Sequence, residues 1–168
     1  MRYLMKVYCY SRKDFVNTLK ALDWNDNTLP KNVAVISICC SDAVKKNYSS
    51  KHYDGDDDTH YLKSSDNVLN LDFDDINDET RQCDGYVAVN INDEQAEEAI
   101  KFIENNVGED RVFLIHCNAG KSRSQAFVRY IEMIYKDKYS IETRKENPCL
   151  FPNTFVYNKL FRHKFNLL

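Results

Sequence analysis

Glycine, proline and long apolar runs are scarce in this chain of 168 residues. Only 4 glycines and 3 prolines are present, which excludes collagen-like and Gly/Pro-rich low-complexity structure. The longest apolar runs, 33–40 and 112–115, are far shorter than the roughly 20 residues that span a bilayer. The N-terminus also lacks the apolar core and cleavage site of a secretion signal. We therefore expect a single domain over 1–168, without a membrane span, cytoplasmic and monomeric.

Paired cysteine spacings and an excess of positive charge are missing as well. The six cysteines contain no C-x-x-C pair, and only Cys39 and Cys40 are close in sequence. Adjacent cysteines cannot chelate one metal ion in the usual way, so we expect no metal site and reduced thiols. The net charge of −3 argues against general nucleic-acid binding, with an RNA 5′ end left as an open alternative.

Strand-like and helix-like segments alternate along the chain. The apolar segments 2–10, 32–40, 68–71 and 111–116 are predicted to be strands, and the continuous runs among them suit strands buried on both faces. Helical spacing and capping residues predict helices after Ser11, over 93–106, over 123–136, over 140–146 and after Pro152. This alternation predicts an α/β fold with a central, mostly parallel sheet flanked by helices.

Acidic side chains gather over residues 54–79. Ten Asp or Glu residues stand there against one Lys, a local charge of −9. The run Asp54–Asp58 is expected to be solvated surface charge, with weak divalent-cation binding as the alternative. Further along, 72–78 is predicted to be a loop that follows the strand 68–71.

The segment 116–124, HCNAGKSRS, joins a predicted buried strand to a predicted helix. A turn of this kind directs successive backbone N–H groups inward, and the helix N-terminus adds positive potential, so an anion cradle of phosphate size results. Cys117 lies at its floor, where the same field favours a thiolate. Arg123 closes the ring with a bidentate guanidinium, and Gly120 lets the turn form without a Cβ clash. We therefore predict a phosphate-binding loop between a buried strand and a helix.

This segment matches H-C-x-x-G-x-x-R-S/T at all five fixed positions, and it resembles the signature of the cysteine-dependent protein tyrosine phosphatase superfamily. The place of the motif in a short chain is similar to the dual-specificity branch, as is Pro152-Asn153 before an aromatic-rich helix. The resemblance implies a phosphatase without cofactor or metal. Its substrate is then a protein that carries phosphotyrosine or phosphoserine/threonine.

The resemblance also assigns roles to the residues of the motif. Cys117 attacks phosphorus and forms a cysteinyl-phosphate, while Arg123 holds the phosphate oxygens. Ser124 hydrogen-bonds the sulfur and eases its departure, and His116 supports the loop from below. The remaining phosphate-binding positions are Asn118, Ala119, Gly120, Lys121 and Ser122.

A proton donor has to stand opposite the thiolate, because the attack expels an alkoxide or a phenoxide. The family supplies an Asp from a mobile loop. The sequence F-D-D at 73–75 resembles that loop in the regenerating-liver phosphatases, which implies Asp75, 42 residues before Cys117, with residues around 79–90 as an insertion. Asp74, Asp78 and Asp84 are the alternatives.

Other functions and a redox role remain open. Lys121 at the loop rim favours a polyanionic substrate, RNA 5′-triphosphate or phosphoinositide, whereas Asn118 stands where such enzymes often carry a second Lys. A non-catalytic phosphate-binding module and a rhodanese-like sulfur transferase are the further alternatives. Cys39 or Cys40, at the end of a strand expected beside the loop, is a candidate disulfide partner of Cys117, and small apolar filling is the other interpretation.

Overall fold

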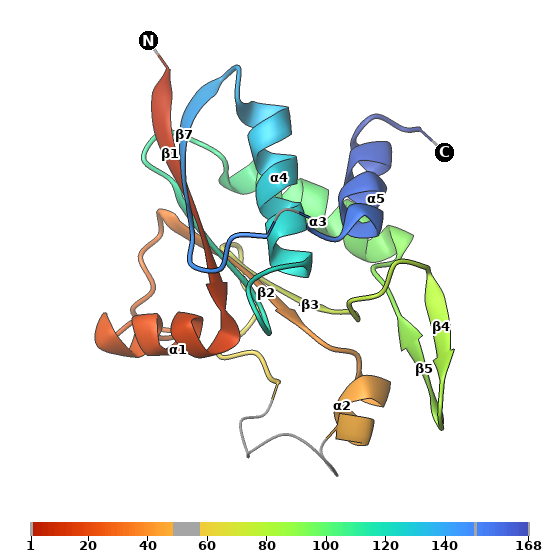
Figure 1. Ribbon diagram of the computed structural model, residues 1–168. Coiled ribbons are helices and arrows are strands. Elements are labelled where there is room, and N and C mark those ends of the chain that lie inside the picture. The colour runs from red at the N-terminus through yellow and green to blue at the C-terminus, as the bar shows by residue number, and fades with distance from the viewer. Residues whose placement is uncertain (1, 49–57, 150, 168) are drawn as a thin grey trace.

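A five-stranded parallel sheet forms the centre of the computed structural model, which describes residues 2–48, 58–149 and 151–167 (Figure 1). The strand order is β3-β2-β6-β1-β7, and each pairing is parallel. These strands are β1 (Tyr3–Ser11), β2 (Val33–Cys39), β3 (Val68–Asp72), β6 (Val112–Cys117) and β7 (Tyr139–Lys145). The predicted α/β fold with a parallel sheet flanked by helices is therefore confirmed.

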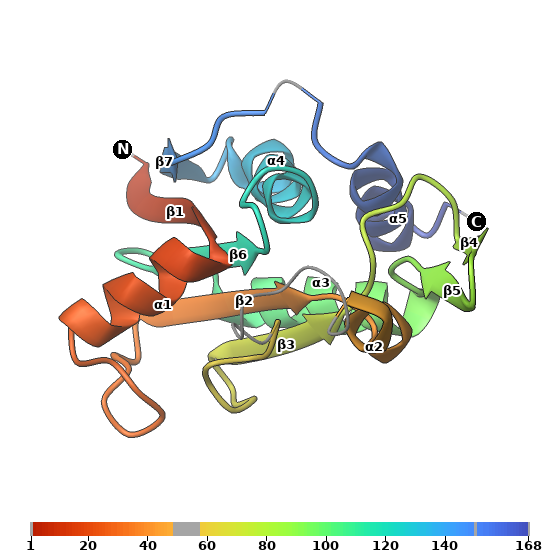
Figure 2. The same ribbon diagram turned by 60° about the horizontal axis from the view of Figure 1, so that its bottom comes forward.

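Helices cover both faces of this sheet (Figure 2). The helices are α1 (Arg12–Ala21), α2 (Asp42–Tyr48), α3 (Asp93–Asn106), α4 (Arg123–Tyr135) and α5 (Thr154–Lys164). Helix α1 packs on one face, and α3, α4 and α5 pack on the other. In the described part of the chain, no helix is both long and apolar enough to cross a membrane.

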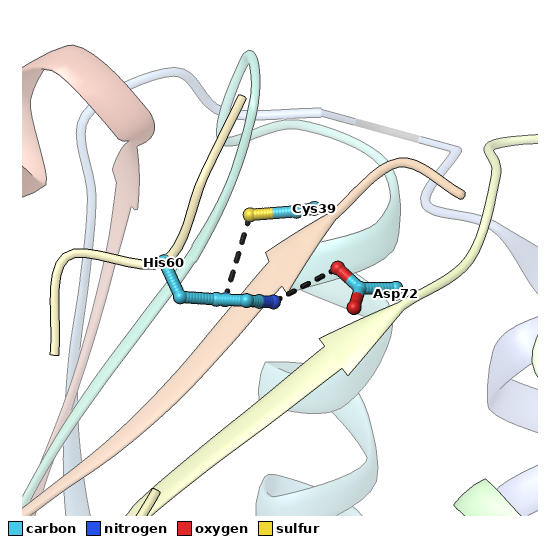
Figure 3. A group of neighbouring side chains, drawn as sticks. All are labelled: Cys39, His60 and Asp72. Atoms are coloured by element: carbon cyan, nitrogen blue, oxygen red, sulfur yellow. Dashed lines mark hydrogen bonds and ion pairs between the residues drawn. The ribbon is translucent and has the colours of Figure 1, made fainter. Parts of the chain in front are cut away.

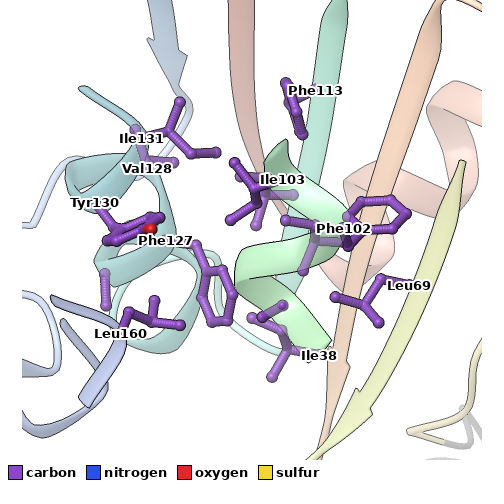
Figure 4. Packing of buried hydrophobic residues seen from close by; sticks show 14 of the residues in the cluster. Ile38, Leu69, Phe102, Ile103, Phe113, Phe127, Val128, Tyr130, Ile131 and Leu160 are labelled. Atoms are coloured by element: carbon purple, nitrogen blue, oxygen red, sulfur yellow. The ribbon is translucent and has the colours of Figure 1, made fainter. Parts of the chain in front are cut away.

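Alternation along each strand divides the apolar side chains between two cores. Every residue of β2 is buried, as its continuous apolar sequence predicts for a strand covered on both faces. Ile36 and Ile38 pack with α3, α4 and α5 in the larger core (Figure 4), whereas Val33 and Val35 pack on the α1 side. Each fully buried aliphatic side chain contributes about 1.5–3 kcal/mol to folding.

Side-chain caps begin three of the helices. Ser11 accepts the N–H of Asp14 and so starts α1, as predicted. Asn92 and Gln95 form a reciprocal capping box at the start of α3, which spans the predicted 93–106. Asn153 accepts the N–H of Val156 at the start of α5. Each such cap stabilises its helix by about 1 kcal/mol.

The predicted helix over 140–146 is wrong, because this segment is the edge strand β7. Its residues pair in parallel with β1, for example Ile141 with Met5. Backbone hydrogen bonds to an exposed strand edge outweigh a weak helical pattern. The alternation of Tyr139, Ile141 and Thr143 with polar residues was the local signal for a strand.

Residues 79–90 contain an antiparallel hairpin that the sequence interpretation missed. Its strands are β4 (Thr80–Cys83) and β5 (Tyr86–Val89), and Asp84-Gly85 forms the turn. An Asp-Gly pair between two short strands is a common hairpin signal. Helix α2, which was also not predicted, contributes Val44 to a small apolar cluster with Ala88 of β5 and Ile76.

The carboxyl ends of three neighbouring parallel strands lie together at one end of the sheet. Ser11, Cys39 and Cys117 are the last residues of β1, β2 and β6, which lie side by side in the sheet. Open parallel sheets bind ligands at the carboxyl ends of their strands, where the strand order reverses. The fold thus places the Cys117 motif where α/β proteins build their sites.

Candidate active site

The segment 117–123, which we call the Cys117 loop, joins β6 to α4. Cys117 at its start is 2% exposed and Arg123 at its end is 4% exposed. Neighbouring segments hold the loop by its carbonyl groups: the N–H of Arg12 donates to Asn118 over 3.0 Å, and the Gln125 amide donates to Gly120 over 2.8 Å. The carbonyl groups are thus engaged from outside the loop.

The backbone N–H groups of the loop differ from its carbonyl groups in their hydrogen bonding. Within the described residues, no backbone or side-chain group accepts from the N–H of residues 119–122. Asn118, Ala119 and Lys121 are exposed, Ser122 is half-buried and Gly120 is buried. Polar donors left without protein acceptors beside a helix N-terminus suit an anion.

Gly120 sits where no other residue fits. Its φ of +67° is in the left-handed region, and a Cβ built there would lie 2.5 Å from the backbone N of Ser11 and from the carbonyl C of Tyr10. These backbone atoms belong to the paired strand β1, so they could move only by distorting the sheet. The close approach of the loop to β1 therefore requires glycine.

Gly120→Ala is expected to destabilise the protein by about 3 kcal/mol or more, from left-handed strain together with overpacking. Gly85→Ala is the matched control, because Gly85 has a φ of +82° but no atom lies within 4 Å of the position that a Cβ would take there. We expect the Gly85→Ala variant to lose only about 1–2 kcal/mol of its free energy of unfolding. Urea unfolding of the two variants measures the difference, and equal losses would contradict a tight approach at Gly120.

A hydrogen-bond chain leads to the sulfur of Cys117. Burial raises the pKa of Cys9 to about 12, so its thiol keeps its proton. Two acceptors lie near that thiol, Ser124 Oγ at 3.2 Å and the carbonyl of Gly120 at 3.6 Å, and Ser124 Oγ lies 3.1 Å from Cys117 Sγ. When Ser124 Oγ, the nearer acceptor, takes the proton of Cys9, its own hydroxyl can donate to Cys117, which suits a sulfur anion.

Arg123 is a buried cation with an unused donor. Its Nη1 donates to the carbonyl of Phe73 over 2.7 Å and to Cys40 Sγ over 3.5 Å. Its Nε is buried without a partner, and the guanidinium forms no ion pair with any described residue. Burial works against the charge, but the neighbouring Cys40, Cys117 and Asp75 keep the pKa of Arg123 above its usual value. A buried, charged and incompletely paired guanidinium is suited to bind an anion.

Asp75 is held against the Cys117 loop. Its Oδ1 accepts from the hydroxyl of Ser122 over 2.8 Å and from the amide of Asn153 over 2.7 Å. Asn153 also caps α5, so one side chain ties the start of that helix to this carboxylate. Because Oδ1 takes both bonds, Oδ2 is the oxygen that can carry a proton.

The other aspartates considered for the acid lie elsewhere. Asp74 is buried and accepts from the N–H and the hydroxyl of Ser41 and from the N–H of Val89, which makes it a structural anchor of the hairpin. Asp78 forms a surface pair with Arg81 at 3.6 Å, and Asp84 lies in the hairpin turn. Of these aspartates, the structure brings Asp75 to the loop.

His116 lies beneath the loop, fully buried. Its Nε2 is 2.7 Å from Ser37 Oγ, its Nδ1 is 3.3 Å from the carbonyl of Cys117, and its ring stacks on Phe15. Burial lowers the pKa of His116 to about 3, so the ring is neutral at ordinary pH. A neutral, enclosed imidazole supports the loop and does not serve as a general acid.

The pKa of His116 predicts a pH dependence of stability. The folded-state pKa of about 3 is below the ordinary value of 6.5, so between these pH values the unfolded chain binds more protons. The free energy of unfolding should therefore fall as the pH falls from 6.5 to about 3. His116 should contribute a slope that approaches about 1.36 kcal/mol per pH unit. An NMR titration checks the cause, because the His116 ring should not titrate above pH 4. A midpoint between 5 and 7 would contradict it.

Cys39 and Cys40 point to opposite faces of the sheet, as the alternation predicts. Cys40 contacts Arg123, and burial raises its pKa to about 11. Cys39 is on the other face, where its Sγ lies 3.5 Å from His60 Nδ1. A disulfide of either with Cys117 stays a prediction, and all six cysteines are free thiols in the structure.

Sequence reasoning missed several residues around the site. Cys9 had no predicted role, although it lies near the end of the first predicted strand and that strand pairs with β6. Asn153 was expected only as a cap, since its contact with Asp75 joins segments that are 78 residues apart. Ser37 and His60 were not singled out. Of the run predicted to be solvated surface charge, residues 54–57 lie outside the described residues. For Asp58 the prediction is wrong, because this residue is half-buried and accepts the N–H of Cys40.

Comparison with known proteins found no relative: no family model, no curated protein and no solved structure matches the chain. The function therefore has to be inferred from the site itself. Its parts are an enclosed cysteine, a buried guanidinium with a free donor, backbone N–H groups without a protein acceptor and a carboxylate fixed at the rim. Such a set can bind a phosphate group, attack it and protonate what leaves.

Proposed function

We propose that the protein is a phosphatase that hydrolyses phosphomonoesters through a cysteinyl-phosphate intermediate, in the manner of the dual-specificity phosphatases. The buried Arg123 is the observation that carries this proposal. Arg123 is the last residue of the Cys117 loop, and its unpaired Nε can donate to an oxyanion bound beside the sulfur. A surface arginine would not need an anion in this way.

In the first step the thiolate of Cys117 attacks phosphorus. The S–P bond forms while the ester P–O bond breaks, and Asp75 gives its proton to the leaving oxygen. Arg123 and the N–H groups of the loop bind the phosphoryl oxygens as charge redistributes over them. The products of this step are the free alcohol or phenol and the cysteinyl-phosphate.

In the second step water hydrolyses the cysteinyl-phosphate. Asp75, now a carboxylate, takes a proton from the attacking water, so the P–O bond forms as the S–P bond breaks. Ser124 donates to the departing sulfur of Cys117, and the Cys9 thiol fixes the direction of that hydroxyl. Inorganic phosphate leaves, and the enzyme returns to its starting state.

We propose a phosphorylated protein as the substrate, in the cytoplasm. Asp58 and Asp75 lie at the end of the sheet that carries the loop, and this negative charge disfavours polyanions such as RNA 5′-triphosphate and phosphoinositide. Lys121 is exposed at the loop and is the group that would favour those rivals. A panel of phosphopeptides, phosphoinositides and 5′-triphosphate RNA decides between them.

Hydrolysis of an aryl phosphate tests the chemistry. It should continue in excess EDTA and stop with vanadate, because the nucleophile is a cysteine and not a metal-bound water. Arg123→Lys should lose most of the activity, since a point charge cannot bind two oxygens as the planar guanidinium does. Hydrolysis that requires a divalent metal would contradict the mechanism, and phosphate binding without any turnover would instead support a non-catalytic binding module.

Asn153→Asp is expected to lower kcat about tenfold or more. The new carboxylate keeps the oxygen that caps α5 but replaces the amide that donates to Asp75, so two like charges face each other. The basic limb of the kcat profile should move to higher pH, because a neighbouring negative charge raises the pKa of an acid. Thermal unfolding close to that of the wild type, together with the shifted profile, separates positioning of Asp75 from loss of the cap. An unchanged kcat profile would contradict the contact.

A further inference from the structure

Cys39, His60 and Asp72 converge at the carboxyl ends of β2 and β3 (Figure 3). Because side chains alternate along β2 and Ile38 packs in the same core as Cys117, Cys39 lies on the face of the sheet opposite Cys117. Cys39 ends β2, Asp72 ends β3, and the two residues are direct partners across the strands. The loop before β3 brings His60 between them, so that one possible ligand atom from each residue lies within 4.8 Å of the others. Cys39 is buried, His60 is half-buried and Asp72 is exposed, which leaves the group reachable from one side.

The hydrogen bonds of His60 leave one ring nitrogen facing a carboxylate. Neutral His116 donates its Nδ1–H to the carbonyl of Cys117 and therefore accepts the single proton of Ser37 at Nε2. With that assignment, Ser37 Oγ accepts from Nδ1–H of His60, 2.7 Å away. The other nitrogen of His60, Nε2, lies 2.8 Å from Asp72 Oδ1. With its proton on Nδ1, His60 has only a lone pair at Nε2, and Asp72 Oδ1 has only lone pairs as well. Two such atoms lie 2.8 Å apart when they share a cation, which is either a proton or a metal ion.

Two further groups favour a metal ion over a proton alone. The Cys39 thiol lies against the same imidazole and is fully buried. Asp58 accepts the N–H of Cys40 with Oδ2, over 2.7 Å, while its Oδ1 is buried without any partner. Because Cys40 follows Cys39 directly, this hydrogen bond holds the Asp58 carboxylate beside the end of β2. A buried carboxylate oxygen without a donor calls for a positive charge.

We propose that Cys39, His60 and Asp72 form a binding site for a zinc ion, with Asp58 next to it. A thiolate, an imidazole and a carboxylate are the ligand types that zinc takes, and the sulfur disfavours magnesium and calcium. Three protein ligands leave a fourth position for water or a further oxygen. Asp58 Oδ1, which is buried without a partner, is the candidate for that further oxygen.

The second ring nitrogen of His60 has the kind of partner that metal-binding histidines have. Metal-binding histidines usually donate their other ring N–H to a fixed acceptor, which orients the ring, and Ser37 is that acceptor for His60. Lys45 competes with the ion, because its ammonium lies 3.3 Å from Asp72 Oδ1. A bound zinc ion must displace this half-buried ammonium. The site is separate from the proposed hydrolysis, although Ser37 also contacts His116 beneath the Cys117 loop.

Cobalt(II) is the probe for the test, because a cysteine ligand gives it a strong thiolate-to-cobalt charge-transfer absorption. The full chain carrying Cys117→Ser is titrated, so that the proposed nucleophile cannot supply the sulfur. We expect one cobalt ion per chain with this absorption, and its displacement by zinc. Adding Cys39→Ser should abolish the band, whereas Cys83→Ser, at a cysteine in the hairpin, should leave it unchanged.

Zinc affinity, measured by competition with a chelator, tests the other residues. His60→Gln and Asp72→Asn should weaken binding by about 100-fold, and Ser37→Ala by about 10–100-fold. Asp72 is exposed, so Asp72→Asn keeps the test valid even if Cys39→Ser does not fold. Lys45→Met should tighten binding. A charge-transfer band that survives Cys39→Ser, or zinc affinity unchanged in Asp72→Asn, would overturn the proposal. Neither result bears on phosphatase turnover, which is measured separately in EDTA.

Discussion

Cys117→Ser is expected to abolish phosphomonoester hydrolysis, with a loss of about 10⁴-fold or more in kcat. The serine hydroxyl keeps the position of the sulfur but is not ionised at neutral pH, so the covalent step cannot occur. Steady-state hydrolysis of an aryl phosphate measures the loss. A trapped phosphoryl group on the wild-type chain, placed at Cys117 by mass spectrometry after acid quench, identifies the intermediate directly.

The same variant should still bind phosphate. Arg123 and the loop N–H groups, which hold the anion, are unchanged by the substitution, so inorganic phosphate should raise the melting temperature of both proteins. Cys83→Ser is the control, because this cysteine lies in the hairpin and its sulfur donates to the carbonyl of Arg81 there. Retention of more than a tenth of the activity in Cys117→Ser would contradict a cysteine nucleophile.

Asp75→Asn is expected to lower kcat by about 10²–10⁴-fold, the usual range for one acid–base group. The amide still fits beside Ser122 but has no proton to give to the leaving oxygen. For substrates with weakly basic leaving groups the fall in kcat should be smaller, since such groups depart without protonation. The basic limb of the kcat profile should also disappear, because it reports loss of the acid's proton as the pH rises.

Asp84→Asn is the matched control for this prediction. Asp84 lies in the turn of the β4–β5 hairpin and forms no hydrogen bond or ion pair with the Cys117 loop in the described structure. Its variant should keep wild-type kcat and the same pH profile. If Asp84→Asn were impaired and Asp75→Asn were not, the assignment of the acid to the loop after β3 would be wrong.

Local periodicity accounts for the elements that the sequence predicted well. Helix α3 has the predicted bounds because apolar residues recur at helical spacing between a capping Asn and a polar end. Strands β2 and β6 were recognised from continuous apolar runs, which are rare outside buried strands. In these segments the burial pattern and the backbone preference agree.

The segments predicted wrongly or missed depend on distant partners. The strand β7 has few buried side chains and gains its conformation from hydrogen bonds to β1, more than 130 residues earlier in the chain. The hairpin β4–β5 packs on Asp74 and on α2, which no local pattern links to it. Weak local preferences of this kind are overridden by tertiary contacts.

The sequence by itself determined the residues of the Cys117 loop, because the turn, its glycine and its arginine lie within one continuous motif. It could not determine which distant groups meet there. The neighbours Cys9, Asp75 and Asn153, like the group formed by Cys39, His60 and Asp72, come from separate segments. Their proximity follows from the strand order β3-β2-β6-β1-β7, which brings the carboxyl ends of these strands to one edge. That order depends on how the side chains of the two cores pack, and the spacing of residues along a single strand does not encode it.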